Sequence, residues 1–369
     1  MPIYWSFLFL SYFLLLFKYN KTKVRYVKNN NEIYFVPKSI VIFPVLYIAL
    51  FVCLRDEVLD TYYYIGDFKN MPTTWEAIQN YTEYSGSKGF HKMMGFFKMY
   101  ISDNYYSWLT FIAFISLCPL FYFYKRHSCN FAFTFFLFVS STTFTWLLNG
   151  ARQFIAVCIL VGLIDLFLSG SKKLKILYIL IGLTLTTIHS SVWFVLPMIY
   201  VCSCGKVLNK RMLLVVVATV VGTMLMGDIM NMASEVMNKD YDISESTGSS
   251  VIRLLVSSVP LFLVLFKLSN IKSEASPFMS FVINMSLVGV CFYFASTFSS
   301  GILVGRMPIY FTIYNFILIP WLLKKYYKNT IFTIFCILGY TFFFYYQMCI
   351  AWSHLDYKSI ALGIQFFRY

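Results

Sequence analysis

Charged side chains are scarce in this chain. Only 12% of its 369 residues are Asp, Glu, Lys or Arg, whereas about 25% is usual for a soluble globular domain. Hydrophobic residues make up 59% of the chain and aromatic residues 21%, and the mean hydropathy is +0.68. This small number of charges cannot cover a water-facing surface. The composition therefore excludes a soluble enzyme, a disordered protein and an ordinary nucleic-acid-binding module.

The motifs of common soluble enzymes are also missing. No P-loop, GxSxG, HExxH or GxGxxG pattern stands in a plausible context. The nine cysteines are scattered, mostly within apolar runs, and their odd number argues against a disulfide framework. We therefore expect no metal site, no soluble cofactor and no nucleic acid partner.

Long apolar runs, by contrast, are abundant. Because about 20 apolar residues cross a bilayer once, these runs predict an all-α polytopic membrane protein with about twelve transmembrane helices. The stretch 175–204 is too long for one ordinary span, and we divide it at its polar break, 189–191. The predicted spans are 3–17, 34–54, 105–124, 131–148, 153–168, 175–188, 191–204, 212–226, 252–268, 278–298, 303–323 and 330–350.

The distribution of Lys and Arg predicts which loops share a side of the membrane. Short basic segments such as 18–32, 125–130 and 205–211 belong in the cytoplasm by the positive-inside rule. This assignment puts 18 Lys and Arg and two acidic residues in the cytoplasmic segments, against 11 and 13 in the external segments and their borders. Both termini are then external, and the net charge of +14 reflects cytoplasmic loops.

Two predicted external segments are large. The first, 55–104, contains amphipathic pieces at 75–84 and 90–100 that are suited to a membrane surface. The second, 227–250, is polar, whereas the predicted cytoplasmic loops are short and simply basic. We therefore expect a single membrane domain, 1–369, whose elaborate chemistry takes place on the external face.

Four arginines fall at or near the predicted outer border of the membrane: Arg55, Arg152, Arg253 and Arg306. The last three lie near the N-termini of inward-running spans, where the helix dipole disfavours a cation. If these helix starts converge, they form a positive pocket that needs an anion, and Arg binds phosphate through a fork of donors. The alternatives are arginines that reach lipid headgroups or that pair with acids elsewhere in the fold.

Acid–base groups lie on the same predicted face. His189 occupies the outer turn between the sixth and seventh spans, where it can act as an acid, a base or a phosphate donor. The segment 55–60 combines Arg55 with three carboxylates, and a carboxylate beside Arg stays ionised and can deprotonate a hydroxyl. A structural histidine and a solvated loop start are the alternatives. Because ATP is scarce outside the cell, group transfer here requires a membrane-borne donor, such as a lipid-linked diphosphate.

These features resemble the EpsG-like family of bacterial polysaccharide polymerases and, more broadly, the Wzy O-antigen polymerases. The resemblance rests on Arg55 followed by Asp60 and Tyr63, on 149–156 (NGARQFIA) followed by His189-Ser190-Ser191, and on 305–310 (GRMPIY) entering a late span. Together with the layout of spans, these motifs cover most of the chain. One departure is Leu59, where the family pattern has a small residue such as Gly.

The resemblance implies a glycosyltransferase of GT-C-like architecture in the bacterial inner (plasma) membrane, with its active site on the periplasmic or external face. It would move a growing glycan from undecaprenyl diphosphate onto a repeat unit carried by the same lipid, making O-antigen or a similar surface polysaccharide. Besides this donor, this acceptor and membrane lipid, a membrane protein that regulates chain length is a further candidate partner. No metal or soluble cofactor is required.

The same resemblance assigns roles to the site residues. His189 would bind the diphosphate or move a proton, and Asp60 would be the base for the acceptor hydroxyl, with Arg55 orienting it. Arg152 would also count as catalytic, because it stabilises charge on the leaving group. The residues expected to bind the diphosphate are Arg55, Arg152, Gln153, Arg253 and Arg306.

Other membrane functions stay open. A flippase for lipid-linked oligosaccharides also tends to have about twelve spans, but it should carry charges at mid-membrane depth and have short loops. An O-antigen ligase would hand the glycan to a lipid core instead of a new repeat unit. A membrane acyltransferase needs His chemistry that a cytoplasmic donor can reach, and His189 faces the other side. A purely structural or receptor role is the last alternative.

Overall fold

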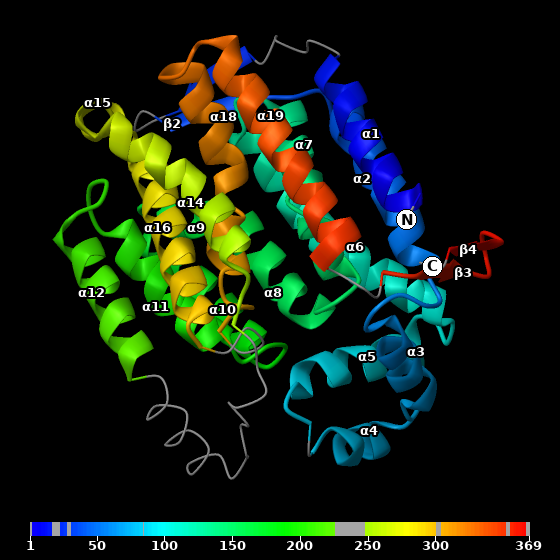
Figure 1. Ribbon diagram of the computed structural model, residues 1–369. Helices are drawn as coiled ribbons and strands as arrows, with labels where there is room; N and C mark the ends of the chain where they lie inside the picture. Colours follow the sequence, from blue (N-terminus) through cyan, green and yellow to red (C-terminus); the bar gives the residue numbers. More distant parts are fainter. Residues whose placement is uncertain are drawn as a thin grey trace. The chain divides into compact units, whose positions relative to one another are not determined.

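The computed structural model (Figure 1) describes residues 2–16, 23–27, 31–83, 85–225, 248–299, 304–351 and 355–366. The described chain is mostly helical. It divides into two compact units. The first unit contains Met1–Arg25, Ile33–Leu196 and Thr333–Tyr369, and the second contains Tyr26–Glu32 and Pro197–Phe332.

The first unit holds most of the N-terminal half of the chain. Within it, α6 packs against α2 and α8, and α1 packs against α7. Its helices are α1 (Pro2–Leu16), α2 (Lys38–Cys53), α3 (Thr61–Asn70), α4 (Trp75–Thr82), α5 (Lys88–Tyr100), α6 (Tyr105–His127), α7 (Phe131–Ser140), the 3₁₀ helix η1 (Thr143–Leu147), α8 (Ala151–Gly162), α9 (Ile164–Leu168) and α10 (Lys172–Thr186).

The remaining elements of the first unit come from the C-terminal part of the chain. Helices α11 (Val192–Ser203) and α19 (Thr330–Tyr345) belong partly to each unit. After α19 follow the π-helix η2 (Tyr346–Ala351) and an antiparallel hairpin of β3 (Tyr357–Ser359) and β4 (Ile364–Phe366). A second two-stranded sheet, from the N-terminal part of the chain and divided between the two units, joins β1 (Lys23–Val27) and β2 (Asn31–Phe35). The two small sheets are departures from the all-α prediction.

The second unit is built around α16 (Pro277–Thr297), which packs against α12, α14 and α17. The loop predicted at 227–250 lies outside the described residues except for 248–250. The other helices of this unit are α12 (Lys210–Met224), α14 (Val251–Phe266), α15 (Leu268–Glu274), α17 (Ile309–Thr312) and α18 (Asn315–Lys325).

Several helices have the character of membrane spans. Among the described residues, α6, α16 and the helix Thr330–Ala351 are long and apolar enough to cross a bilayer, and α14 with α15 makes a fourth if this pair, bent by 81°, is one span. Helices α1, α2, α7, α8 and α11 are apolar but shorter. Large apolar side chains stay exposed on α12 and α19, including Leu213, Leu214, Phe335 and Leu338. Lipid covers such surfaces more readily than water, so the chain is a helical membrane protein.

The helices break within several predicted spans. The span predicted at 153–168 is divided between α8 and α9, and the one at 131–148 ends as α7 at Ser140 and continues as η1. Between these two pieces Thr142 has a φ of +62°, and the Ser140 hydroxyl donates to the Phe136 carbonyl at 2.7 Å. Such side-chain bonds to the backbone bend or end helices inside apolar runs. The break predicted at 189–191 is present, between α10 and α11.

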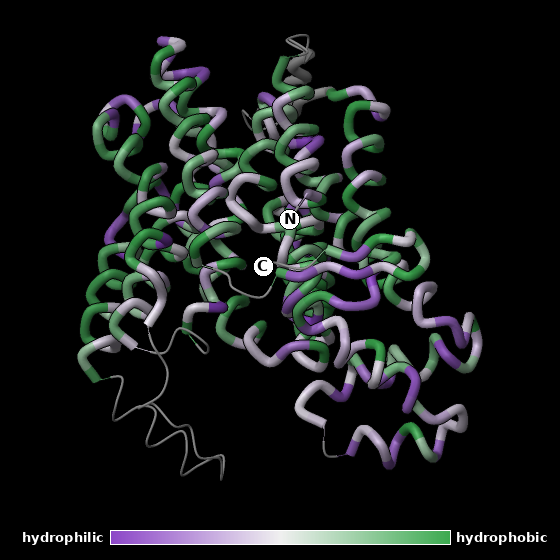
Figure 2. Tube along the Cα trace, turned by 45° about the vertical axis from the view of Figure 1, so that its right-hand side comes forward, coloured by the Kyte–Doolittle hydropathy of each residue, from purple (hydrophilic) through white to green (hydrophobic). Residues whose placement is uncertain are grey.

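The predicted external segment 55–104 is folded into α3, α4 and α5, where Figure 2 shows many hydrophilic residues. The two predicted amphipathic pieces correspond to α4 and α5. On α5, Phe90 and Phe97 are buried and pack on Trp108 of α6 with ring centroids 5.6 and 5.4 Å away. The apolar face of α5 is therefore part of the protein core and does not lie free for a membrane surface.

Candidate functional site

Arg55, just after α2, is completely buried in the first unit. Its Nε donates to the Thr61 hydroxyl at 2.7 Å and its Nη1 donates to the Val52 carbonyl, while Nη2 has no hydrogen-bond partner among the described residues. Burial lowers the pKa of Arg55 to about 10. Because its guanidinium is covered, these contacts favour the predicted orienting role over direct contact with a diphosphate.

Asp60 directly precedes α3 and contacts the start of α8. Its Oδ2 accepts a hydrogen bond from the Gly150 amide at 3.2 Å, and within the described residues Oδ1 accepts none. The residue before it, Leu59, has a φ of +48°, in the left-handed region that favours glycine. This geometry suits the small residue, such as Gly, that the resemblance leads us to expect at that position. The turn leaves one carboxylate oxygen of Asp60 available to a substrate hydroxyl.

Arg152 is the second residue of α8 and is held by residues of α3 and α5. Its Nη1 donates to the Ser87 hydroxyl at 3.3 Å, and its guanidinium lies 6.0 Å from the centroid of the Phe90 ring. Burial raises the pKa of Tyr64, and the charge and hydrogen bonding of Arg152 partly oppose this shift. None of the ion pairs in the described part of the chain includes Arg152. Arg152 therefore brings a positive charge without an ion-pair partner among the described residues to this helix start, where Asp60 accepts from the Gly150 amide.

His189 lies in the turn between α10 and α11 and is half-buried. Its Nδ1 is 2.7 Å from the Ser191 hydroxyl and accepts a long hydrogen bond from the Ser191 amide at 3.4 Å. These contacts favour the neutral tautomer that carries its proton on Nε2. In that tautomer Nε2 is a donor, which is the form suited to a phosphate oxygen.

The start of α5 links the His189 turn to Arg152. The Gly89 amide donates to the Thr187 carbonyl at 2.9 Å, and a Cβ on Gly89 would lie 2.0 Å from the Thr187 hydroxyl oxygen. Only glycine permits this close approach. Since Ser87, two residues earlier, contacts Arg152, the same helix start touches both segments.

Asp60, Arg152 and the turn that carries His189 are thus linked within the first unit through the starts of α5 and α8. Gln153 is only 1% exposed and lies among core residues. Arg253 on α14 and the exposed Arg306 before α17 belong to the second unit. A pocket shared by all the arginines therefore stays a prediction.

Sequence reasoning missed a cluster on the same segment. His91 is buried, with Nδ1 2.7 Å from the Ser85 hydroxyl and Nε2 3.6 Å from an Asp67 oxygen. Ser87, which contacts Arg152, lies between Ser85 and His91 in the sequence, and its carbonyl oxygen is 3.2 Å from Nδ1 of His91. The serines before the amphipathic piece at 90–100 signal a helix start. Nothing local in the sequence signals their contact with Arg152.

The chemistry available in this region is anion binding and proton transfer. Arg152 and the start of α8 supply positive charge, His189 supplies an imidazole ring, and Asp60 supplies a carboxylate. No group of three or more His, Cys, Asp or Glu among the described residues is placed to hold a metal ion. The region suits a diphosphate leaving group and a hydroxyl nucleophile.

Comparison with known proteins gives a family but no individual relative. The model of the EpsG family matches residues 38–359, from the first residue of α2 to the last residue of β3. The matched range includes every candidate site residue. No curated protein and no solved structure matches the chain significantly.

Proposed function

Because the chain belongs to the EpsG family, we propose that it is a membrane glycosyltransferase that polymerises lipid-diphosphate-linked oligosaccharide repeat units. Family membership supports a polymerase-like role in polysaccharide biosynthesis, and the apolar helices support a membrane location. Donor and acceptor are glycans on undecaprenyl diphosphate, and the product is O-antigen or a similar surface polysaccharide. The enzyme works at the external face of the bacterial plasma membrane, in a bundle of about twelve spans with GT-C-like architecture.

The observation that carries this proposal is a chain of contacts: Asp60 meets Gly150 at the start of α8, Arg152 meets Ser87 before α5, and Gly89 of α5 meets Thr187, two residues before His189. A transferase needs a base for the acceptor and positive charge for the leaving group within one site. Asp60 keeps one oxygen open, and Arg152 has no ion-pair partner among the described residues. The arrangement therefore favours group transfer over a path for transport through the membrane.

The proposed reaction has one bond formed and one broken. The acceptor hydroxyl oxygen attacks the anomeric carbon of the donor glycan while Asp60 takes the hydroxyl proton. The bond from that carbon to the diphosphate oxygen breaks, and undecaprenyl diphosphate leaves with the electron pair. Arg152 and His189 stabilise the charge on the leaving group, with Arg253 and Arg306 as further proposed contacts. Because both substrates are held in one membrane, proximity lowers the barrier further.

Contacts between loops support the proposed grouping of loops into two sides of the membrane within the first unit. Two loops that touch are separated by an even number of membrane crossings, and the predicted spans satisfy this parity. Two contacts join segments assigned to the outside: Asp60 with Gly150 and Glu57 with Lys358. Two more join a loop to the near end of a predicted span: Gly89 with Thr187 at the outer end of 175–188, and Arg126 with Asp165 at the cytoplasmic end of 153–168.

The experiment that tests the function is a gel of surface polysaccharide from a strain lacking the gene, with and without the gene restored. A ladder that collapses to a core-plus-one-repeat band supports a polymerase. Loss of all surface repeats, with single lipid-linked units trapped on the inner leaflet, would mean a flippase. Long chains that accumulate on lipid without reaching the core would mean a ligase. Restoration with Asp60→Asn should fail, whereas the exposed Glu83→Gln is the matched control and should succeed.

A further inference from the structure

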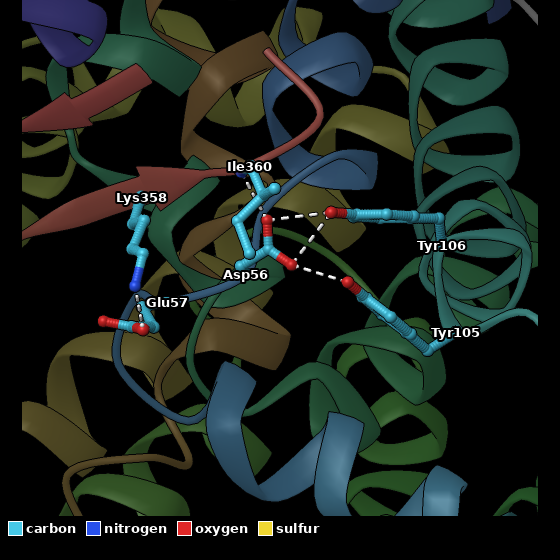
Figure 3. A network of polar contacts seen from close by, with 6 residues as sticks. All are labelled: Asp56, Glu57, Tyr105, Tyr106, Lys358 and Ile360. Carbon is cyan, nitrogen blue, oxygen red and sulfur yellow. Dashed lines mark hydrogen bonds and ion pairs between the residues drawn. The ribbon is translucent and has the colours of Figure 1, made fainter. Parts of the chain in front are cut away.

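A buried carboxylate next to Arg55 joins three distant parts of the first unit. Asp56 is only 9% exposed. Its Oδ1 accepts hydrogen bonds from the hydroxyls of Tyr105 at 2.7 Å and Tyr106 at 2.9 Å, at the start of α6. Its Oδ2 accepts from the Tyr106 hydroxyl at 2.9 Å and from the Ile360 amide at 2.7 Å (Figure 3). One side chain therefore connects the predicted external segment to the C-terminal hairpin.

Backbone contacts reinforce the same connection. Lys358 of β3 pairs with Glu57 in an antiparallel bridge, in which the Lys358 amide donates to the Glu57 carbonyl at 2.9 Å. The Asp56 amide donates to the Lys358 carbonyl at 2.8 Å. The Ser359 hydroxyl donates to the Leu54 carbonyl at the end of α2. The C-terminal hairpin thus adds a short strand along the chain that leaves α2.

The links in this network differ in strength. Glu57 and Lys358 form an ion pair at 2.7 Å, but the Glu57 side chain is 56% exposed and that of Lys358 is 31% exposed. Exposed pairs of this kind contribute little because water screens them. Asp56 instead accepts charge-assisted hydrogen bonds in a buried position, where losing the acceptor leaves the donors unpaired. Asp56 is therefore the dominant side-chain link.

The network lies at one end of the segment that carries the candidate base. Arg55, the neighbour of Asp56, reaches the Thr61 hydroxyl at the start of α3. Asp60 lies between these two points, in the turn that contains the strained Leu59. Tyr357 of β3 further donates to the Phe51 carbonyl of α2 at 2.8 Å. Both ends of the Asp60 turn are therefore anchored, one by α3 and one by the C-terminal hairpin.

We infer that Asp56 is a positioning residue for Asp60, and that the C-terminal hairpin at 355–366 is a structural part of the proposed transfer site. The inference rests on the proposed function. Asp56 does not contact the substrates. It holds the start of the 55–60 segment against β3, so that the open oxygen of Asp60 meets the acceptor hydroxyl.

The test uses the full-length chain in lipid nanodiscs and lipid-linked repeat units extracted from the deletion strain. Asp56→Ala should lower kcat about 10- to 100-fold, since small displacements of a reacting group cost that much. The Kd for undecaprenyl diphosphate should change less than about threefold, because the binding residues are elsewhere. Asp56→Asn, which keeps one acceptor oxygen, should recover part of the loss.

A double-mutant cycle with Asp60→Asn distinguishes a positioning role from a merely structural one. It compares the loss of kcat caused by Asp56→Ala with and without the Asp60 carboxylate. If Asp56 acts through Asp60, then Asp56→Ala should cost little kcat in the Asp60→Asn background. Equal costs in both backgrounds, a wild-type kcat for Asp56→Ala, or a loss of kcat that follows the loss of folded protein would each overturn the inference.

Two controls complete the experiment. Charge reversal of the exposed pair, Glu57→Lys or Lys358→Glu, should change kcat less than about twofold, because exposed ion pairs are weak. A loss as large as that of Asp56→Ala would contradict the assignment of Asp56 as the dominant link. The wild-type chain distinguishes a failure of the proposed function from a failure of the positioning role of Asp56. Absence of polymer from the wild type overturns the proposed function, whereas an active wild type with an additive cycle overturns only the inference.

Discussion

The connections of the first unit differ between the two predicted sides of the membrane. Those assigned to the outside contain helices α3 to α5 and bury Arg55, Asp56 and His91 among hydrogen-bonding partners. Those assigned to the cytoplasm are the segment of β1 and β2 and short turns. Near these turns Asp165 lies 2.8 Å from Arg126, both more than a third exposed, and 3.1 Å from His127, whose side chain is 7% exposed.

This difference shows that the outer connections hold their polar side chains in a more precise geometry than the inner connections do. Burying a polar group costs free energy unless it forms hydrogen bonds. A fold that buries several polar groups therefore holds them close to their hydrogen-bonding partners. Exposed ion pairs at turn ends stabilise little and position little. The outer connections are therefore the better candidates for chemistry, and the inner ones for topology.

The largest expected effect is at Arg152. Arg152→Ala should lower polymer formation about 10³-fold, because an arginine that stabilises charge on a leaving phosphate group has effects of that size. Arg152→Lys should also be poor, since the fork of donors is lost. Chain length on gels and kcat in nanodiscs measure both. Arg126→Ala, on the opposite predicted side, is the matched control and should stay within about twofold. Long chains from Arg152→Ala would remove the distinction between the two sides.

The next effect is expected at His189. His189→Ala should lower kcat about 10²-fold, at the lower end of the range for proton-transfer groups. His189→Gln keeps a donor and should retain more activity if the ring binds the diphosphate. Near-normal activity of the Ala variant would reassign His189 to packing in the turn between α10 and α11.

A smaller effect is expected from relief of backbone strain at Leu59, whose φ is +48°. The left-handed conformation costs a residue other than glycine about 1–2 kcal/mol, and glycine loses roughly 0.5–1 kcal/mol more entropy on folding. Leu59→Gly should therefore stabilise the protein by about 0.5–1 kcal/mol in thermal melts. Leu208, in a predicted cytoplasmic loop, has a similar φ of +47°, so Leu208→Gly is the matched substitution and should stabilise the protein in the same way. Loss of stability in both variants would contradict the strain argument.

The smallest effect is expected at the cytoplasmic pair. Asp165→Asn should change the free energy of unfolding by less than about 1 kcal/mol and kcat by less than about twofold, because the pair is partly exposed. Melting temperature and polymer length measure the two quantities. A defect comparable with that of His189→Ala would show that the inner connections also position the site.

The fold was predictable where local composition decides it. The apolar runs predicted the helical membrane character, and the polar break at 189–191 appears as the end of α10 and the start of α11. The break at Leu163 was missed because it lies inside an apolar stretch. The break at Thr142 was missed because the short polar run 140–143 is enclosed by the apolar residues of the predicted span 131–148. The C-terminal hairpin was missed too, since its two strands have three residues each and depend on pairing with the segment after α2.

The candidate site was predictable in residue type more than in contacts. Arg152 and His189 stood out as polar groups at predicted span borders, where their presence is costly. Ser87 and Tyr64 did not, because serine and tyrosine are ordinary in a polar loop, and Asp56 was noted only as one of the three carboxylates of 55–60. Their significance comes from burial and from partners elsewhere in the chain.

The sequence by itself determined that this protein is helical, lies in a membrane and carries basic and acidic groups at predicted span borders, because solvation and charge act residue by residue. Only the tertiary structure decided that Asp60 meets Gly150 across 90 positions and that Asp56 meets Ile360 across 304. Such pairs form because helix packing brings distant backbone groups together, and buried polar atoms then need each other as partners.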